Sequence, residues 1–458
     1  MRTVALHNLG CKVNSYEIEV MQQNFEKSGY KIVPFDTKAD IYIVNTCTVT
    51  NIADRKSRQM LHRAKKMNPD ALVVATGCYV QTDRAGAEAD ESIDLCVGNN
   101  RKSEIVAIVE EYINDNKKND NSVIDVNDGF IEYEEMTLEK TAEHVRAYIK
   151  IQDGCNQFCT YCAIPYARGR VRSRKKEQIV EEITGLTKQG YKEFVLSGIH
   201  ISSYGLDYVD KDNSLGDYLE SSKDKRAVAY EKGYLLDLLR AVDAIDGVER
   251  LRISSLEPRI ITEEFAKGLS ELKSICPHFH LSLQSGSDSV LKRMNRHYSA
   301  DEYYDRVEIL RKYFDNPAIT TDIITGFPGE TEEEFAETEA FVKRVNFYET
   351  HIFRYSPRKG TIAAKMPDQI YEPVKALRSD ILIKINEESS HSYRERMLGQ
   401  RLEILVEERK KINGKYYMIG HTRDYVMAAV SDESAKINDI VSGVALSFLN
   451  PEVILLDQ

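Results

Sequence analysis

The sequence has no apolar run long enough to form a membrane-spanning helix. Its longest apolar stretches, such as residues 105–109 and 425–430, are far shorter than the about 20 residues that a spanning helix needs. Residues 1–17 also turn polar too early for a secretory signal. We therefore expect a cytoplasmic protein with no membrane partner, and its 458 residues allow about two to four domains.

A disulfide framework and a positive net charge are also lacking. Eight cysteines in a cytosolic chain of this length are unlikely to form a disulfide framework. Clustered cysteines in such a chain more often bind metal or take part in catalysis. Lys and Arg number 62 against 73 Asp and Glu, which gives a net charge of −11. That balance argues mildly against a nucleic-acid partner, because phosphate binding draws on Lys and Arg.

Two stretches of the chain are basic although its net charge is negative. One lies within residues 55–66, and it can equally be interpreted as a solvated helix face or as a binding surface. The other, residues 168–176, carries six positive charges in nine positions directly after a cysteine motif. For this second stretch we favour phosphate contacts over a solvated face. Its arginines are Arg168, Arg170, Arg172 and Arg174.

The first 125 residues alternate between strand-like and helix-like segments. Short apolar runs at 3–7, 41–45 and 72–75 each precede a polar turn and a helical pattern, which indicates parallel βα units. Asn14 with Glu17 resembles a capping box that opens a helix through Lys27. We therefore predict an N-terminal parallel α/β domain at 1–125, followed by a weakly structured joint at 113–140.

Strand-like and helix-like segments alternate again in residues 141–390, whereas residues 397–458 contain short strand-like segments only. Strand-like segments lie at 147–151, 193–197, 250–254, 278–283, 319–324 and 349–355. Six strand–helix repeats predict a partial (β/α)6 barrel, with residues 204–232 as an irregular insertion. Five short strand candidates in 397–458 predict a small antiparallel β-barrel. The expected fold class is α/β.

Cys155, Cys159 and Cys162 have the spacing C-x3-C-x2-C and follow a predicted barrel strand at its carboxyl end, where barrel active sites lie. A four-iron cluster usually takes four thiolates, so a motif of three leaves one iron open. That iron can bind the amino and carboxylate groups of S-adenosylmethionine (SAM), which makes these cysteines catalytic candidates. The alternatives are chance or a zinc knuckle completed by His144 or His200, although zinc sites favour C-x2-C pairs.

Cys11, Cys47 and Cys78 each fall just past the carboxyl end of a predicted strand. In a parallel sheet those ends share one edge, so the three thiols would converge and hold a second cluster. The alternative is three buried cysteines that act as small apolar side chains. Cys96 and Cys276 have no partners in either pattern and are interpreted as bystanders.

Together these motifs resemble the methylthiotransferases, radical SAM enzymes that insert sulfur into an unactivated C–H bond and methylate it. The resemblance covers nearly the whole chain. The segments that carry it are 8–14, 44–49, 76–79, 152–155, 159–166, 254–258, 283–287 and 326–330. It implies two 4Fe–4S clusters as cofactors, with the six clustered cysteines as metal ligands, and an RNA-binding TRAM domain at the C-terminus.

The resemblance also implies a SAM-binding role for Gly198, Glu257 and Gln284. For Glu257 and Gln284 the alternative is an ordinary polar barrel rim. Tyr161 is expected to lie against the SAM adenine, because aromatic rings stack on nucleobases, or else to pack within its loop. One SAM would serve as methyl donor and another as radical source. The hydrogen that must be removed is not acidic, so an ordinary general base is inadequate.

Three branches of this family fit: two modify isopentenyladenosine or threonylcarbamoyladenosine in tRNA, and one modifies an aspartate of a ribosomal protein. Segments 198–205 and 167–174 look most like the threonylcarbamoyladenosine branch, which acts at C2 of the adenosine at position 37, although the insertion after Tyr204 departs from its pattern. A metal-stapled RNA-binding protein without catalysis is the alternative of another class. An open three-cysteine motif disfavours it, because a structural site would be closed.

The implied partners are a tRNA anticodon stem-loop, an electron-donor protein such as a flavodoxin, and a sulfur donor. The arginines of 168–174 would hold phosphates beside the target base, and the C-terminal barrel would grip the stem. Residues 397–458 are not basic overall, with seven Lys and Arg against nine Asp and Glu. The best basic and aromatic patch there is Lys410, Lys411, Lys415, Tyr416 and Tyr417.

Overall fold

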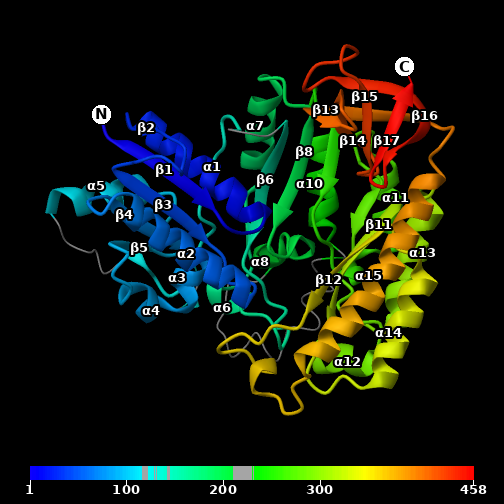
Figure 1. The fold of residues 1–458 in the computed structure, drawn as a ribbon, viewed down its shortest axis with the longest axis horizontal. Helices are drawn as coiled ribbons and strands as arrows, with labels where there is room; N and C mark the ends of the chain where they lie inside the picture. Colours follow the sequence, from blue (N-terminus) through cyan, green and yellow to red (C-terminus); the bar gives the residue numbers. More distant parts are fainter. Residues whose placement is uncertain are drawn as a thin grey trace.

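The computed structural model describes residues 1–115, 122–127, 129, 131–141, 145–209, 230 and 232–457. The chain passes from an N-terminal α/β unit, through an open barrel, to a small C-terminal barrel (Figure 1). Within the described residues, no helix has both the length and the apolar character needed to cross a membrane. Positions 210–229 and 231 of the expected insertion, and His144, lie outside the described residues.

The N-terminal unit is built on a parallel sheet of order β2-β1-β3-β4-β5. Its strands are β1 (Thr3–Asn8), β2 (Lys31–Ile32), β3 (Ile41–Thr46), β4 (Leu72–Gly77) and β5 (Leu95–Val97). Its helices are α1 (Lys12–Lys27), α2 (Asn51–Met67), α3 (Cys78–Thr82), α4 (Arg84–Glu88) and α5 (Ile105–Asp115). Apolar side chains fill both sides of the central strands, as expected of a sheet covered on both faces.

Helix α1 begins earlier than the sequence predicts. Cys11 is its N-cap, so Asn14 and Glu17 lie inside the helix, and the capping-box prediction is wrong. Both side chains are only 1% exposed. The reason is tertiary: Asn14 Nδ2 donates to Asn45 Oδ1, and Glu17 forms ion pairs with buried cations. A local pattern cannot distinguish such partners from a helix cap.

The central unit is a partial (β/α)6 barrel, as predicted. Its parallel strands are β6 (Arg146–Asp153), β8 (Glu193–Gly198), β9 (Arg250–Ile253), β10 (His278–His280), β11 (Ala318–Thr325) and β12 (Glu349–Arg354). Parallel bridges Leu251↔Ile275 and Leu256↔Leu281 connect the two halves of this curved sheet. A short strand, β7 (Arg172–Ser173), pairs antiparallel with β6. The barrel is open between β6 and β12.

Helices cover the outside of this barrel. The α-helices are α6 (Ile164–Arg168), α7 (Lys176–Thr187), α8 (Leu206–Val209), α10 (Tyr234–Asp243), α11 (Glu263–Ser270), α12 (Asp288–Arg293), α13 (Ala300–Tyr313), α14 (Glu332–Val345) and α15 (Glu372–Glu395). The 3-10 turns are η2 (Ile201–Ser203), η3 (Pro258–Ile260) and η4 (Ala363–Lys365). Capping boxes open α13 and α14 at Ser299 and Thr331. The largest apolar core lies between these helices and the strands.

The described part of the joint between the first two units is packed, although it forms no helix or strand. Met136 and Leu138 are buried against the N-terminal core. The backbone N–H of Leu138 donates to Glu182 Oε1, and Tyr16 contacts the carbonyl of Met136. Residues 131–141 therefore lack regular secondary structure, as predicted, but they pack between the N-terminal core and α7.

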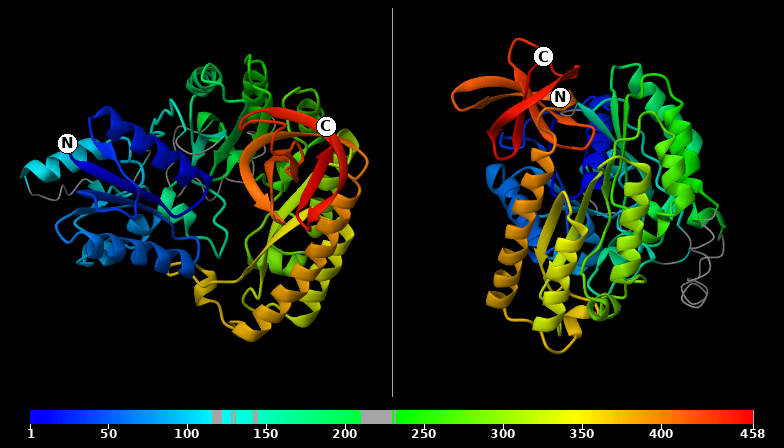
Figure 2. Two further views of the ribbon diagram at one scale, coloured as in Figure 1. Left: turned by 45° about the horizontal axis from the view of Figure 1, so that its top comes forward. Right: turned by 90° about the vertical axis from the view of Figure 1, so that its right-hand side faces the viewer.

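The C-terminal unit is a closed barrel of order β13-β14-β15-β17-β16. Its strands are β13 (Arg401–Ile412), β14 (Lys415–Thr422), β15 (Met427–Ser431), β16 (Ile440–Asn450) and β17 (Val453–Asp457). Four of the five pairings are antiparallel as predicted, but β15 and β17 pair in parallel. The long helix α15 leads into this unit (Figure 2). Arg250 and Arg252 of β9 donate to carbonyls of β14 and its turn, which attaches the small barrel to the large one.

Candidate functional site

The loop after β6 places Cys155, Cys159 and Cys162 together. Cys155 and Cys159 are buried, Cys162 is partly exposed, and the Cys162 N–H donates to the Cys159 carbonyl at 3.0 Å. Burial and the two neighbouring thiols raise the pKa of Cys162. Gly154 begins this loop with φ +72°, and a Cβ there would lie 1.8 Å from the Arg170 carbonyl oxygen. Only glycine allows the chain to turn here.

Arg296 faces this loop and was not anticipated from the sequence. Its Nη1 lies 3.4 Å from Cys159 Sγ, while Nη2 donates to the Ser282 carbonyl at 3.1 Å. Its Nε donates to the Tyr298 hydroxyl at 2.9 Å. The Arg296 guanidinium therefore connects the cysteine loop to the segment after β10. No motif marks Arg296, because its proximity to Cys159 arises from the fold alone.

Cys11, Cys47 and Cys78 gather at one edge of the N-terminal sheet, directly after β1, β3 and β4. Burial and the nearby Cys78 raise the pKa of Cys47 to about 11, and burial also raises that of Cys11. Gly77 precedes Cys78 with φ +98°, and a Cβ there would lie 2.6 Å from the Thr46 carbonyl oxygen. The convergence expected from the strand ends is present.

The donor sets of both cysteine trios fit iron–sulfur clusters better than single zinc ions. Three thiolates that bind one ion lie close together. Within the described chain, one set of Cys, His, Asp or Glu residues has all its ligand atoms within 4.8 Å of one another, and it consists of His280, Asp322 and His351. Each cysteine trio is therefore wider than a single-ion site. A four-iron cluster, which holds its thiolates on separate iron corners, suits that wider spacing.

The four residues expected to bind SAM lie near the carboxyl ends of the barrel strands. Gly198 ends β8 and packs against Gln152, where a Cβ would lie 2.9 Å from Gln152 Oε1. Glu257 is buried and accepts a bond from Arg259 Nε at 2.6 Å. Gln284 bridges to β11, and Tyr161 packs beside an apolar group that includes Met294 and Phe327. All four therefore lie on the side of the barrel that carries the cysteine loop.

Three residues of the described chain other than glycine, asparagine and aspartate have a strained backbone. Of the ten non-glycine residues with positive φ in the described chain, six are asparagine and one is aspartate, which tolerate that conformation. The other three are Phe158, Gln284 and Tyr425. Phe158 lies in the cysteine loop, Gln284 at a barrel strand end and Tyr425 on a cavity wall. Strain of this kind persists where surrounding structure holds it, often at functional sites.

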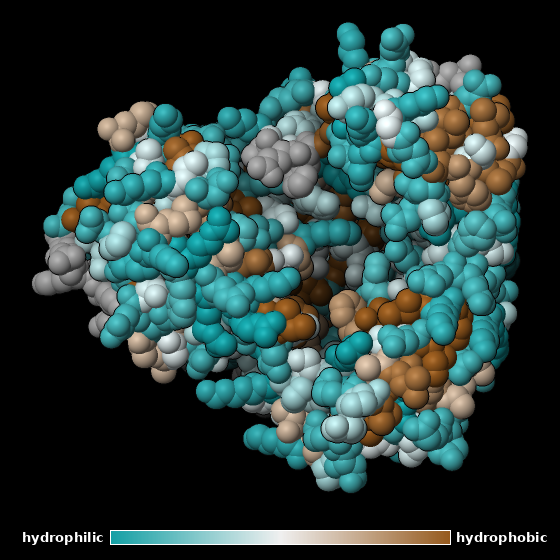
Figure 3. Space-filling model, viewed as in Figure 1, coloured by the Kyte–Doolittle hydropathy of each residue, from teal (hydrophilic) through white to brown (hydrophobic). Residues whose placement is uncertain are grey.

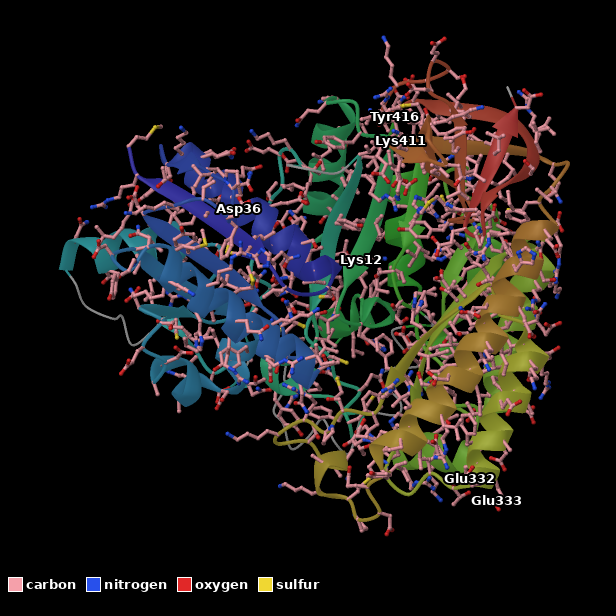
Figure 4. The ribbon with its side chains drawn as sticks, in the orientation of Figure 1. Lys12, Asp36, Glu332, Glu333, Lys411 and Tyr416 are labelled. Atoms are coloured by element: carbon pink, nitrogen blue, oxygen red, sulfur yellow. The ribbon has the colours of Figure 1, made fainter. Side chains whose placement is uncertain are left out.

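A cavity of about 260 Å³ occupies the barrel interior. Figure 3 shows the molecule hollowed between the N-terminal unit and the barrel, and in the same view Figure 4 labels Lys12 at this hollow. Polar side chains from β6, β9, β10, β11 and β12 line the cavity, together with Lys12 and Tyr425. Burial and the charges of Arg252 and Lys12 lower the pKa of His278 well below its usual value, so this ring is neutral.

The arginines expected to bind phosphate are mostly buried. Arg168 and Arg174 are almost fully buried, and both form ion pairs, Arg168 with Glu17 and Arg174 with Glu182. Arg172 is also buried, beside Asp153. For these three the phosphate prediction is wrong, because carboxylates of the protein already occupy them. Arg170 is partly exposed and packs its guanidinium over Phe158, 4.5 Å from the ring centre.

Glu17 is the centre of this buried ion-pair network. It accepts bonds from Lys150 at 2.9 Å and Arg168 at 2.8 Å, and it also pairs with Lys102. Burial alone would raise the pKa of Glu17, but these three cations outweigh it and hold the pKa well below its usual range. The network fixes α1 against β6 and the helix that follows the cysteine loop.

Arg358 holds the opposite edge of the barrel. This buried side chain follows β12, and its Nη2 donates to Thr48 Oγ1 at 2.6 Å and to Asp54 Oδ2 at 2.5 Å. The N-terminal unit therefore contacts both open edges of the barrel, β6 through Glu17 and the segment after β12 through Arg358. The cysteine trio of one unit is thereby brought to the mouth of the other.

Comparison with known families matches two parts of the chain. The family described as Radical SAM superfamily matches residues 149–342, which hold the cysteine loop and most of the barrel. The family described as Uncharacterized protein family UPF0004 matches residues 3–98, which hold the N-terminal sheet and its three cysteines.

Curated relatives match nearly the whole chain. "Threonylcarbamoyladenosine tRNA methylthiotransferase MtaB" of Bacillus subtilis is 40% identical over 96% of this chain and 93% of its own length. "tRNA-2-methylthio-N(6)-dimethylallyladenosine synthase" of Pelotomaculum thermopropionicum is 32% identical over 94% of this chain and 92% of its own. Among solved structures, the radical S-adenosylmethionine methyltransferase TsrM of Kitasatospora setae has a TM-score of 0.54 at 16% identity, covering 79% of this chain and 77% of that one. That similarity concerns the fold.

Proposed function

Because the chain belongs to the radical SAM methylthiotransferases, we propose that it converts N6-threonylcarbamoyladenosine at position 37 of tRNA to its 2-methylthio derivative. The observation that supports this proposal is the 40% identity, over 96% of this chain, to a threonylcarbamoyladenosine tRNA methylthiotransferase, in a chain that carries one cysteine trio after β6 and another at the strand ends of the N-terminal sheet. Relatives named for dimethylallyladenosine are less similar than this one, at 32% to 36% identity.

In this proposal Cys155, Cys159 and Cys162 hold the 4Fe–4S cluster that binds SAM, and Cys11, Cys47 and Cys78 hold the auxiliary cluster. When bound, these cofactors supply the adenosyl radical, the sulfur and the methyl group; the protein supplies binding and orientation. Arg296 holds the cysteine loop in place through its 3.4 Å contact with the Cys159 sulfur and its bond to the Ser282 carbonyl. The barrel wall and the N-terminal unit enclose the target base and exclude water from it.

The partners follow from this chemistry. The substrate is the anticodon stem-loop, whose single-stranded loop offers a base that a deep pocket admits. An electron-donor protein such as a flavodoxin reduces the cluster, and a sulfur donor restores the sulfur that each turnover consumes. All of these act in the cytoplasm, where tRNA is modified and thiols stay reduced. The C-terminal barrel serves as a TRAM RNA-binding domain.

Nucleoside mass spectrometry of tRNA tests the proposal. We expect cells that lack the gene to accumulate N6-threonylcarbamoyladenosine and to lose its 2-methylthio form, and a plasmid copy to restore that form. Methylthio-isopentenyladenosine serves as the internal control and should not change. A loss of the isopentenyl product with an intact threonylcarbamoyl product would move the protein to the other tRNA branch, and no change in either would contradict both assignments.

The β13–β14 hairpin provides the exposed basic patch that a TRAM role requires. Lys411 and Tyr416 lie at the outer surface of the small barrel (Figure 4), and Tyr416 is 46% exposed. Arg409 packs over the Tyr416 ring at 3.9 Å, and Lys415 is exposed beside it. Cations next to an aromatic face combine phosphate attraction with base stacking.

We expect replacing Lys411 and Lys415 by glutamine to weaken tRNA binding mainly at low salt. The slope of log K against log salt concentration should become shallower by about one unit per lysine, because each phosphate contact releases counterions. Filter binding of tRNA at several salt concentrations measures this slope. The matched control replaces Lys188 and Lys267, exposed lysines on the barrel helices. An equal slope change in both variants would contradict a specific role for the hairpin.

A further inference from the structure

The barrel cavity has two walls of different chemistry. One wall is cationic and consists of Lys12, Arg146 and Arg252. The facing wall carries His280, Asp322, Glu349 and His351. Such a division favours a ligand that has a negative charge at one end and neutral polar groups at the other. Lys12 comes from α1 of the N-terminal unit, whereas the other residues of both walls belong to the barrel strands.

The cationic wall has more positive charge than its protein partners neutralise. Glu193 is shared by Arg146, Arg250 and Arg252. Glu407 and Glu403 supply one further carboxylate each, to Arg146 and Arg250. Lys12 has no salt bridge or hydrogen bond to any group in the described chain, and the same cations keep the adjacent His278 neutral. Lys12 is therefore the cation left available to a ligand.

The facing wall offers imidazole and carboxylate groups that can form hydrogen bonds. His280 Nδ1 lies 3.0 Å from Thr320 Oγ1, which orients the ring, and its Nε2 lies 3.3 Å from Asp322 Oδ2. The rings of His280 and His351 stack at 5.8 Å, so their nitrogens and the Asp322 carboxylate converge on one point. Asp322 and Glu349 repel an anion and accept bonds from N–H or O–H groups.

We propose that this cavity binds the threonylcarbamoyl substituent of the target base, with its carboxylate on Lys12 and its hydroxyl and urea N–H groups toward His280, Asp322 and His351. This inference rests on the proposed function and names the feature that selects the substrate. An apolar isopentenyl group would leave Lys12 and the polar wall buried without partners, which is costly. Lys12 directly follows Cys11, so a substituent held there keeps the base beside the auxiliary cysteine trio.

Two anticodon stem-loops test the inference: one with the free threonyl carboxylate and one in which that carboxylate is a carboxamide. We expect the natural enzyme to prefer the carboxylate by at least about tenfold in kcat/KM, mainly through KM, because a site built for a charged group discriminates against its neutral analogue. Lys12→Gln should lose this preference, and Lys12→Arg should retain most of it. Lys31→Gln, an exposed lysine on β2, is the matched control and should keep the preference.

The outcomes separate this inference from the proposed function. If the natural enzyme modifies neither loop but modifies an isopentenyladenosine loop, the proposed function fails. If it modifies both threonylcarbamoyl loops equally well, the function stands and the cavity assignment is overturned. If Lys12→Gln keeps the full preference at unchanged iron content, Lys12 is not the carboxylate-binding residue. Should Lys12→Gln lose iron, the comparison of the two loops with the natural enzyme decides.

Discussion

Replacing Cys159 with alanine is expected to abolish methylthio transfer and reductive SAM cleavage together. Cys159 is one of only three thiols in its loop, so the SAM-binding cluster would be left with two protein ligands. Nucleoside mass spectrometry of tRNA measures the first activity, and release of 5′-deoxyadenosine on reduction measures the second. Iron should fall from about eight to about four atoms per chain, because a four-iron cluster needs its cysteine ligands.

Two further cysteine variants make this result specific. Cys78→Ala should also end methylthio transfer, but it should keep SAM cleavage and about four irons, because it belongs to the other trio. Cys276→Ala is the matched control, since Cys276 is buried and belongs to neither trio, and it should retain the product and full iron content. Full iron in Cys159→Ala, or loss of SAM cleavage in Cys78→Ala, would contradict the assignment of the two clusters.

Changing Glu17 to glutamine is expected to lower the free energy of unfolding by about 3–5 kcal/mol. Removing one partner of a buried ion pair leaves uncompensated charge, which typically costs that amount. Here three buried cations, Lys102, Lys150 and Arg168, would share the loss. The urea midpoint of the apo protein measures it, and iron content offers a second readout, because Arg168 ends the helix after the cysteine loop.

The matched control for Glu17 is Glu26→Gln on the same helix. Glu26 pairs with Lys140 at 3.2 Å at the surface, where an ion pair contributes about 1 kcal/mol or less. The pH dependence of stability provides a further test of the role of Glu17. Its pKa is depressed in the folded protein, so its contribution is complete above the ordinary value of 4.5 and is lost only as pH falls well below it. Equal midpoints for the two variants would contradict the central role of Glu17.

The sequence predicts the fold and the cysteine sites well where the signal is local or follows from topology. Apolar runs with turn signals locate the parallel strands, and the rule that parallel strand ends share an edge is enough to bring Cys11, Cys47 and Cys78 together. The C-x3-C-x2-C spacing places the other trio on a single loop, because the three positions are too near in the chain to separate. In both cases a few residues determine the geometry.

The predictions fail for charged residues whose partners depend on burial in the folded chain. Arg168, Arg172 and Arg174 form a basic stretch in the sequence, but the fold buries them beside the carboxylates of Glu17, Asp153 and Glu182. Charge counted along the chain cannot reveal such partners. Arg296 was missed for the converse reason, because nothing local marks it. The signal for Lys12 was present, since it stands beside Cys11 in the motif at 8–14, but only the cysteine was interpreted.

The barrel depends on a separate part of the chain for its missing side. Glu17 joins one open edge and Arg358 the other, so the reaction chamber has all its walls only when the N-terminal unit is docked. A fragment that starts at the barrel would deprive Lys150 and Arg168 of Glu17 and leave Asp153 as the carboxylate that they share. A chimaera that exchanges N-terminal units between relatives must therefore preserve both contacts, the one made by Glu17 and the one made by Arg358. If either contact is lost, one side of the barrel remains open.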